Sequence, residues 1–179
     1  MIPSIWLFSG DRGNVRYCLG EAKKKNILVI GVNPGMSMPG EKQVTTRNAV
    51  KVIENQFGSD YGWIMVNLHT QRTTNPEKLS SNVEWSTNNI QVIESVVNDF
   101  GIQDVWCAWG DAIDNPGKEF LYESLKVIYK TIGNKCTWYY YDKLTNKNNP
   151  KHPRSAQYDK SYGKLENFSV FDYLTAKGY

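Results

Sequence analysis

The chain has 179 residues, of which 40% are hydrophobic and 22% charged, and its formal net charge is +3. These values predict one globular domain over residues 1–179 and exclude a disordered or fibrous protein. No apolar run approaches the roughly 20 residues of a membrane span, and no secretory signal is visible at the N-terminus. We therefore expect a cytoplasmic protein with no membrane partner, and a monomer is favoured.

Hydrophobic periodicity predicts alternating strands and helices along the chain. In order, we expect a β-hairpin with arms at 6–9 and 15–19, a strand at 27–30, a helix at 43–57, a strand at 62–68, a long loop at 69–87, a helix at 88–100, a strand at 105–109, a helix at 117–132, a strand at 136–141, a basic loop and a helix around 168–176. This alternation is typical of a three-layer α/β/α sandwich with a largely parallel central sheet.

The stretch Ile27–Gly40 is the element around which the rest is organised. Ile27 to Ile30 form a short apolar run typical of a strand buried on both faces, and Gly31-Val32-Asn33-Pro34-Gly35 then break it into a loop. A loop at the carboxyl end of an interior strand is where open α/β folds bind ligands. An ordinary strand-to-helix turn would look the same. The glycine spacing fits neither a phosphate loop nor a dinucleotide fingerprint.

Polar residues follow three other predicted strands. Asn67 ends the second core strand, Trp109-Gly110 ends the third, and His152 lies beyond the fourth. Because the carboxyl ends of parallel strands share one sheet edge, Asn33, Asn67 and His152 are predicted to share a cleft. Each also has a plain structural interpretation: Asn33 as a turn residue, Asn67 as a partner for nearby backbone, and His152 as an exposed loop residue.

Two further groups of residues are candidate sites. The basic stretch 143–164 interleaves lysines with tyrosines and suits either a phosphate-tracking surface or a solvated loop. The cysteines and histidines show no spacing that argues for zinc, so inert buried thiols are favoured and no metal is expected. The residues concerned are Cys18, Cys107, Cys136, His69 and His152.

Four motifs, in order between about Ile27 and Ser155, resemble those of the uracil-DNA glycosylase superfamily. Gly31 to Gly35 are similar to the first motif of its mismatch-specific branch, and Lys151-His152-Pro153-Arg154-Ser155 resembles its His-Pro-Ser motif. Ile64 to Asn67 and Trp109-Gly110 are similar to the intervening strand ends. The whole chain also resembles a family of small bacterial and phage proteins known only as a domain of unknown function. The loop Met36-Ser37-Met38 departs from the pattern, since it offers no aromatic ring.

The resemblance implies a uracil-DNA glycosylase-like fold and a role for each matching residue. Asn33 would position the attacking water, Asn67 would bind the Watson–Crick edge of an extruded base, and His152 would donate to the departing base. No metal and no cofactor are implied. The remaining expected contacts are pocket lining by Gly31, Val32, Pro34, Gly35, Trp109 and Gly110, stacking by Trp6, Trp63 or Trp109, and nucleic-acid binding by Lys147, Lys151, Arg154, Ser155, Tyr158 and Lys160.

Three functions follow from this interpretation. The first is a base-excising DNA glycosylase acting in repair on uracil-like or modified bases, with DNA as partner. The second is a weak or inactive relative that binds a nucleotide, a modified base or DNA, as in phage–host conflict. The third is a nucleoside hydrolase, which would not need the basic stretch.

Overall fold

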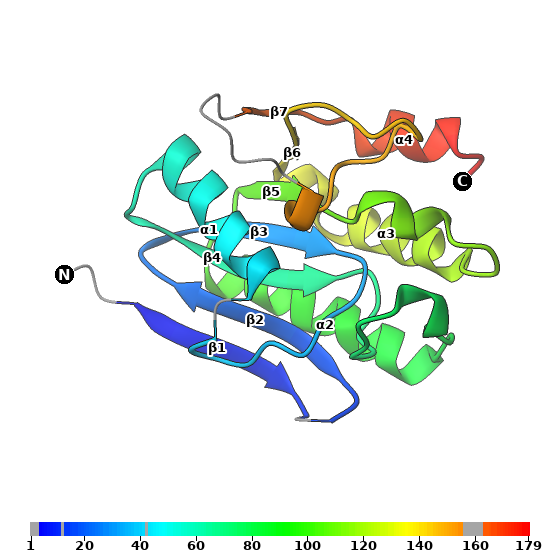
Figure 1. Cartoon of the computed structure of the whole chain (residues 1–179), viewed down its shortest axis with the longest axis horizontal. Coiled ribbons are helices and arrows are strands. Elements are labelled where there is room, and N and C mark those ends of the chain that lie inside the picture. The colour runs from blue at the N-terminus through cyan, green and yellow to red at the C-terminus, as the bar shows by residue number, and fades with distance from the viewer. Residues whose placement is uncertain (1–3, 12, 42, 156–162) are drawn as a thin grey trace.

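The computed structural model describes residues 4–11, 13–41, 43–155 and 163–179. Its strands form one seven-stranded sheet in the order β1-β2-β4-β3-β5-β6-β7 (Figure 1). The strands are β1 (Ile5–Gly10), β2 (Arg16–Ala22), β3 (Lys25–Gly31), β4 (Tyr61–Asn67), β5 (Asp104–Cys107), β6 (Thr137–Tyr141) and β7 (Leu165–Asn167). The four α-helices of the described residues are α1 (Val44–Phe57), α2 (Val83–Asp99), α3 (Phe120–Ile132) and α4 (Val170–Ala176). No helix in these ranges has the length and apolar character to cross a membrane.

The sheet is mixed, with a parallel centre. Strands β4, β3, β5 and β6 run parallel, whereas β1, β2 and β7 pair antiparallel at the two sides. β3 lies between β4 and β5, and its residues Ile27 to Ile30 are 0% exposed. The continuous apolar run of β3 is therefore buried on both faces, as the sequence predicted.

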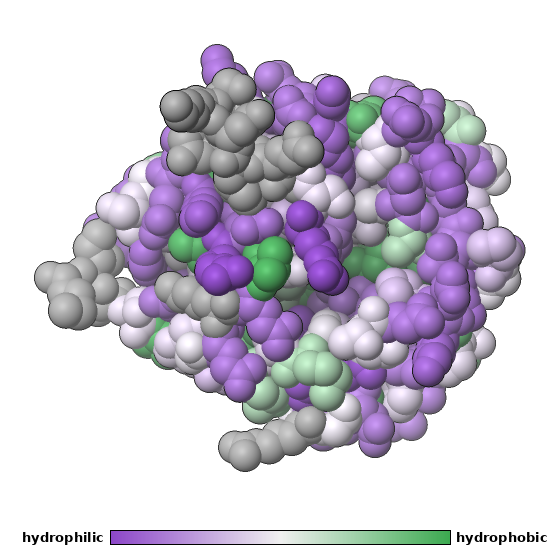
Figure 2. All heavy atoms as spheres, viewed as in Figure 1, coloured by the Kyte–Doolittle hydropathy of each residue, from purple (hydrophilic) through white to green (hydrophobic). Residues whose placement is uncertain are grey.

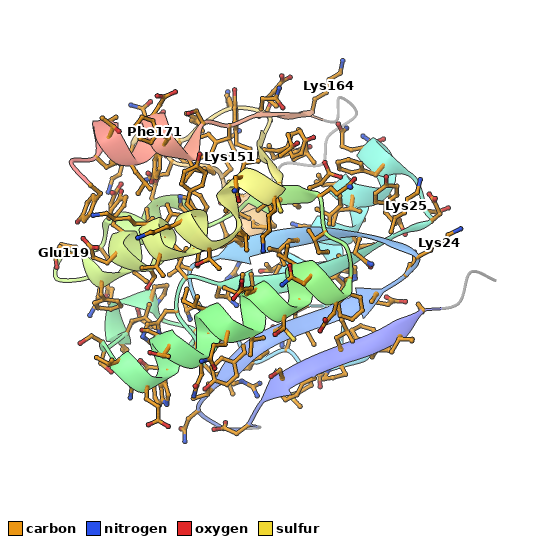
Figure 3. The ribbon with its side chains drawn as sticks, turned by 180° about the vertical axis from the view of Figure 1, so that it is seen from behind. Lys24, Lys25, Glu119, Lys151, Lys164 and Phe171 are labelled. Atoms are coloured by element: carbon orange, nitrogen blue, oxygen red, sulfur yellow. The ribbon has the colours of Figure 1, made fainter. Side chains whose placement is uncertain are left out.

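Helices cover both faces of this sheet. Figure 1 shows α1 in front of the strands, and the reversed view in Figure 3 shows α2 and α3 over the other face. Side chains of α1 pack with alternate residues of β3, including Ile27 and Val29. The intervening Leu28 and Ile30 belong to the core on the α2 and α3 side. Strand alternation thus divides β3 between two cores, and this holds the end of the strand in place.

The structure corrects several predicted boundaries. The segment 69–87 is not a single long loop, because α2 begins at Val83, where the Asn82 side chain accepts a hydrogen bond from the backbone N–H of Trp85 at 2.9 Å. The sheet also gains β7, which was not predicted. The predicted hairpin is present as β1–β2, and the pairing of β2 with β4 makes it part of the sheet. The polar composition of 80–82 concealed the helix cap.

Candidate functional site

A pocket of about 350 Å³ lies at the edge of the sheet where the parallel strands end. Figure 2 shows the face that carries α1, hollowed beside the carboxyl ends of β3 and β4. The pocket is lined by the loop after β3, the end of β4, the turn after β5, the start of α1 and the segment 152–154. Asn33, Asn67 and His152 all line it. The structure thus brings together three residues that are distant in the sequence, since more than 110 positions separate Asn33 from His152.

Asn67 is the most deeply buried polar residue of the three. It ends β4 opposite Gly31 of β3, and only 2% of its surface is exposed. Its backbone carbonyl accepts from the Nδ2 of Asn89 at 2.8 Å, but its own Nδ2 has no hydrogen-bond partner among the described residues. A Cβ at position 31 would lie 2.7 Å from the Asn67 Oδ1, so glycine is required beside this amide. A buried amide donor without a partner costs about 1–3 kcal/mol, which a ligand acceptor would recover.

Asn33 is held by its amide nitrogen. Its Nδ2 donates to the carbonyl of Thr73 at 2.7 Å and to that of Pro34 at 3.2 Å. Both amide protons are therefore used within the protein. The Oδ1 is left as the atom of this side chain that can accept a hydrogen bond from a water or a ligand.

His152 is partly buried and holds one tautomer. Its Nδ1 accepts the backbone N–H of Arg154 at 3.1 Å, so the proton of the neutral ring is carried by Nε2. Burial, with the charge of Arg154, lowers the pKa of His152 to about 4. At neutral pH the ring is therefore uncharged, with Nε2–H as its donor.

The turn after β5 holds the backbone next to His152 in place. Gly110 has a φ of +63°, and a Cβ built on it would lie 3.0 Å from the Cβ of His152. The Gly110 N–H donates to the carbonyl of Pro150 at 2.9 Å. From the other side, the buried Asn48 of α1 donates from Nδ2 to the carbonyl of Pro153 at 2.9 Å. The histidine segment is thus fixed between α1 and the β5 turn.

A buried polar network anchors the loop that leads to His152. Asn149 is 0% exposed, and its Nδ2 donates to Asp111 Oδ1 at 2.9 Å and to Asp114 Oδ2 at 2.7 Å. Its Oδ1 accepts from the hydroxyl of Tyr173 in α4 at 2.8 Å. Lys177 closes the network with an ion pair to Asp114 at 3.2 Å. Every polar atom of the Asn149 amide group is satisfied, so this residue has a structural role.

The other predicted lining residues divide into two groups. Gly31, Val32, Gly35 and Gly110 line the pocket with Asn33. Pro34 does not: it is buried, and its carbonyl accepts from Thr73 N at 3.0 Å.

The tryptophans suggested for stacking on a base belong to the core. Trp109 borders the pocket, but its indole is 0% exposed and packs against Phe168 and Tyr173. Trp6 and Trp63 pack on each other and do not line the pocket. The apolar residues that do line it include Val32, Met36 and Met65. A planar ligand would contact aliphatic side chains instead.

The predicted basic surface is described only in part. Lys151, labelled in Figure 3, forms an ion pair with Asp142 at 2.6 Å. Arg154 is exposed and lines the pocket, whereas Lys147 and Ser155 are outside its lining. Tyr158 and Lys160 lie outside the described residues. Among the predicted nucleic-acid contacts that fall within the described residues, Arg154 is the one that lines the pocket.

Sequence reasoning missed Arg16, a charged residue of the pocket lining. It is the first residue of β2 and only 2% exposed. The signal was a single arginine in the otherwise uncharged run 15–19, which was interpreted as one arm of a hairpin. Because β2 runs antiparallel to β4, its first residue lies at the edge where β4 ends.

Metal ligands do not gather in the described part of the chain. No group of three or more histidine, cysteine, aspartate or glutamate side chains lies close enough there to hold a metal ion. Cys18 and Cys107 are buried free thiols and Cys136 is partly buried. Burial raises the pKa of Cys136 to about 11, which disfavours its thiolate.

The family of the chain follows from its sequence between Arg16 and Arg154. The family described as protein of unknown function (DUF1643) matches residues 16–154, and the chain belongs to this family. The match covers every pocket residue from Arg16 to Arg154 and excludes α4. No curated protein matches the chain.

Proposed function

We propose that this protein hydrolyses the N-glycosidic bond of an extruded uracil-like or modified base that binds in the pocket. The observation that carries the proposal is the presence of three polar groups in one pocket. They are the neutral imidazole donor of His152, the unpartnered amide donor of Asn67 and the amide oxygen of Asn33. Helices on both faces of the sheet agree with the three-layer α/β/α sandwich of the uracil-DNA glycosylase superfamily.

The chemistry requires stabilisation of a departing anion. When the bond between the sugar C1′ and the base nitrogen breaks, the electron pair stays on the base and positive charge develops on the sugar. Fixed donors aimed at the base oxygen lower this barrier, and each contributes about a hundredfold to a thousandfold in rate. His152 is neutral and donates from Nε2, so it would fill that role without any change in its own protonation state.

The two asparagines would orient the reactants. Asn67 Nδ2 would donate to an acceptor on the Watson–Crick edge of the base and so satisfy its own buried amide. Asn33 Oδ1 would accept a hydrogen bond from the water that attacks C1′. An amide oxygen orients water but is too weak a base to take its proton, which therefore passes to bulk solvent or to the released base.

Extrusion of a base from a duplex limits the choice of substrate. It costs a few kcal/mol, and least where the base is mismatched, damaged or already in a single strand. Single-stranded oligonucleotides and mismatched duplexes are therefore the first substrates to test.

The experiment is a single-turnover assay on labelled oligonucleotides with one uracil, one mismatched thymine or one modified pyrimidine. Alkaline cleavage of abasic sites reports base release. We expect His152→Gln to slow release about a hundredfold to a thousandfold. Asn33→Ala removes the acceptor for the attacking water and should also slow base release. Its matched control is Asn98→Ala, which changes an exposed asparagine at the end of α2 and should leave the rate of base release unchanged. Absence of abasic product with every substrate would refute the hydrolase.

Asn33 itself favours a second candidate, a protein that binds a nucleotide or base without cleaving it. Its amide lacks the basicity of a carboxylate, so the pocket can recognise a base while leaving the bond intact. Thermal unfolding against a nucleotide panel separates the two, since a ligand at a hundred times its Kd stabilises by about 2.7 kcal/mol. Selective stabilisation without base release supports binding alone, and no stabilisation by any nucleotide refutes it.

A further inference from the structure

The pocket lining includes a buried cation, Arg16 of β2, which is 2% exposed. The side chain of Arg16 lines the pocket, and its Nη1 donates to the carbonyl of Ser37 at 3.0 Å. Its Nε is buried and has no hydrogen-bond partner among the described residues. Burial, with the charge of Arg72, lowers the pKa of Arg16 to about 10, so the guanidinium is still protonated at neutral pH.

No carboxylate neutralises this charge within the described residues. The Arg16 side chain donates its hydrogen bond to a neutral carbonyl, and the neighbouring Arg72 adds a second positive charge. Asp111, a carboxylate that lines the pocket, follows β5 and accepts there from Asn149. A buried guanidinium without a counter-ion is costly, and an anionic ligand would remove that cost.

The start of α1 provides further donors to the same pocket. Its N-cap, Gln43, makes no side-chain cap, and its first turn has no acidic residue. The first backbone bond of the helix runs from Arg47 N to Gln43 O at 2.9 Å, so the N–H groups of Val44, Thr45 and Thr46 have no acceptor within the helix. Thr45 and Thr46 line the same pocket. Free N–H groups and the positive end of the helix dipole favour an anion.

We propose that Arg16 and the N-terminus of α1 form a phosphate subsite, which takes a phosphate attached to the sugar of the bound nucleoside. The assignment of an anion rests on Arg16 and α1. Its identity as a nucleotide phosphate rests on the proposed function, which places the base near Asn67 and His152. One pocket would then bind the two parts of the ligand with different residues: the base with Asn67 and His152, and the phosphate with Arg16 and the start of α1.

A purely structural role for Arg16 makes a different prediction. Its bond to Ser37 ties down the loop 36–38, and Arg72 holds the same loop through the carbonyl of Met36 at 2.8 Å. If that were the whole role, replacing Arg16 would weaken nucleoside and nucleotide binding equally. A phosphate subsite instead predicts a loss confined to ligands that carry the phosphate.

The test is calorimetric titration with 2′-deoxyuridine, its 5′- and 3′-monophosphates, a single-stranded oligonucleotide with one uracil, and inorganic phosphate. We expect at least one of the three phosphate-bearing uracil ligands to bind more tightly than 2′-deoxyuridine. Arg16→Gln should weaken the tighter ligands about 10- to 100-fold and the nucleoside little, as for a charge-assisted hydrogen bond of about 1.5–3 kcal/mol. Lys130→Gln removes one positive charge from the exposed side of α3 and should bind as the wild type. The free monophosphates and the oligonucleotide distinguish a nucleotide ligand from a nucleic-acid strand.

A second variant covers the case in which Arg16→Gln fails to fold. Thr45→Asp places a negative charge in the first turn of α1, which favours the helix but repels an anion. It should abolish the phosphate-dependent gain in affinity, whereas Thr45→Asn, of the same shape without the charge, should retain most of it.

Three outcomes overturn the subsite. They are equal loss for nucleoside and nucleotide in Arg16→Gln, a Thr45→Asp variant that binds the monophosphates as well as Thr45→Asn, and no gain from any phosphate. If no uracil ligand binds but inorganic phosphate does so in an Arg16-dependent way, the anion site stands and the proposed base pocket falls.

Discussion

Replacing Asn67 by leucine should separate stability from ligand binding. The leucine side chain has the same number of heavy atoms as asparagine and branches at the same carbon, but it is bulkier and has no polar atoms. In the protein without ligand, Asn67 Nδ2 is buried and unpartnered, and a buried unsatisfied group costs about 1–3 kcal/mol. Asn67→Leu should therefore raise the free energy of unfolding by up to about that amount, less any cost of fitting the branched end beside Gly31. In a protein of this size, 1 kcal/mol corresponds to roughly 2–4 °C in Tm.

The same variant should lose affinity for the base. An acceptor on the ligand would face an apolar side chain, and leaving it unpaired costs about 1–3 kcal/mol, which corresponds to roughly 5- to 150-fold in Kd. Urea unfolding and titration with 2′-deoxyuridine 5′-monophosphate measure the two quantities on the same preparation.

Asn26 provides a matched control on the neighbouring strand. It is also buried, but its amide is fully used: Oδ1 accepts from Lys23 N at 2.8 Å and Nδ2 donates to Lys23 O at 2.9 Å. Asn26→Leu should destabilise the fold by about 1–3 kcal/mol. The reasoning about Asn67 is refuted if Asn67→Leu is destabilised as much as Asn26→Leu, or if it binds the nucleotide as well as the wild type.

Two other perturbations test the histidine end of the pocket. Gly110→Ala should lower stability by about 1–2 kcal/mol, which is the cost of a left-handed conformation for a residue with a side chain. It should also slow base release, because the added methyl group displaces His152. Normal stability and a normal rate would contradict this contact. Because the pKa of His152 falls from 6.5 to about 4 on folding, the unfolded state binds more protons between these values, so stability should rise with pH from about 4 to 6.5. His152→Gln should reduce that rise in urea unfolding at a series of pH values; the slope that remains belongs partly to His69, whose pKa is also lowered by burial. An unchanged slope would show that His152 is not held neutral by the fold.

The predictable part of the site came from one geometric rule. The apolar run Ile27–Ile30 identified an interior strand, and parallel strands place their carboxyl ends together. That rule was enough to place Asn33, Asn67 and His152 near one another without any knowledge of side-chain contacts. Hydrophobic periodicity predicted the central strands of the sheet.

The part that could not be predicted depends on pairings between distant segments. Arg16 reaches the pocket only because β2 pairs with β4 in the antiparallel sense, and nothing in the residues 15–19 specifies that partner. The buried position of Asn149 depends on α4, because the hydroxyl of Tyr173 donates to its Oδ1. The tryptophans were misjudged for the opposite reason: a large apolar ring beside a site satisfies the core as readily as it satisfies a ligand.

The most direct test is a crystal structure of the protein with bound 2′-deoxyuridine 5′-monophosphate. The account predicts the uracil in the pocket within hydrogen-bond distance of Asn67 Nδ2 and His152 Nε2, with the phosphate at Arg16 and the first turn of α1. A nucleotide bound elsewhere, or bound in the pocket with its base away from Asn67 and His152, would contradict it.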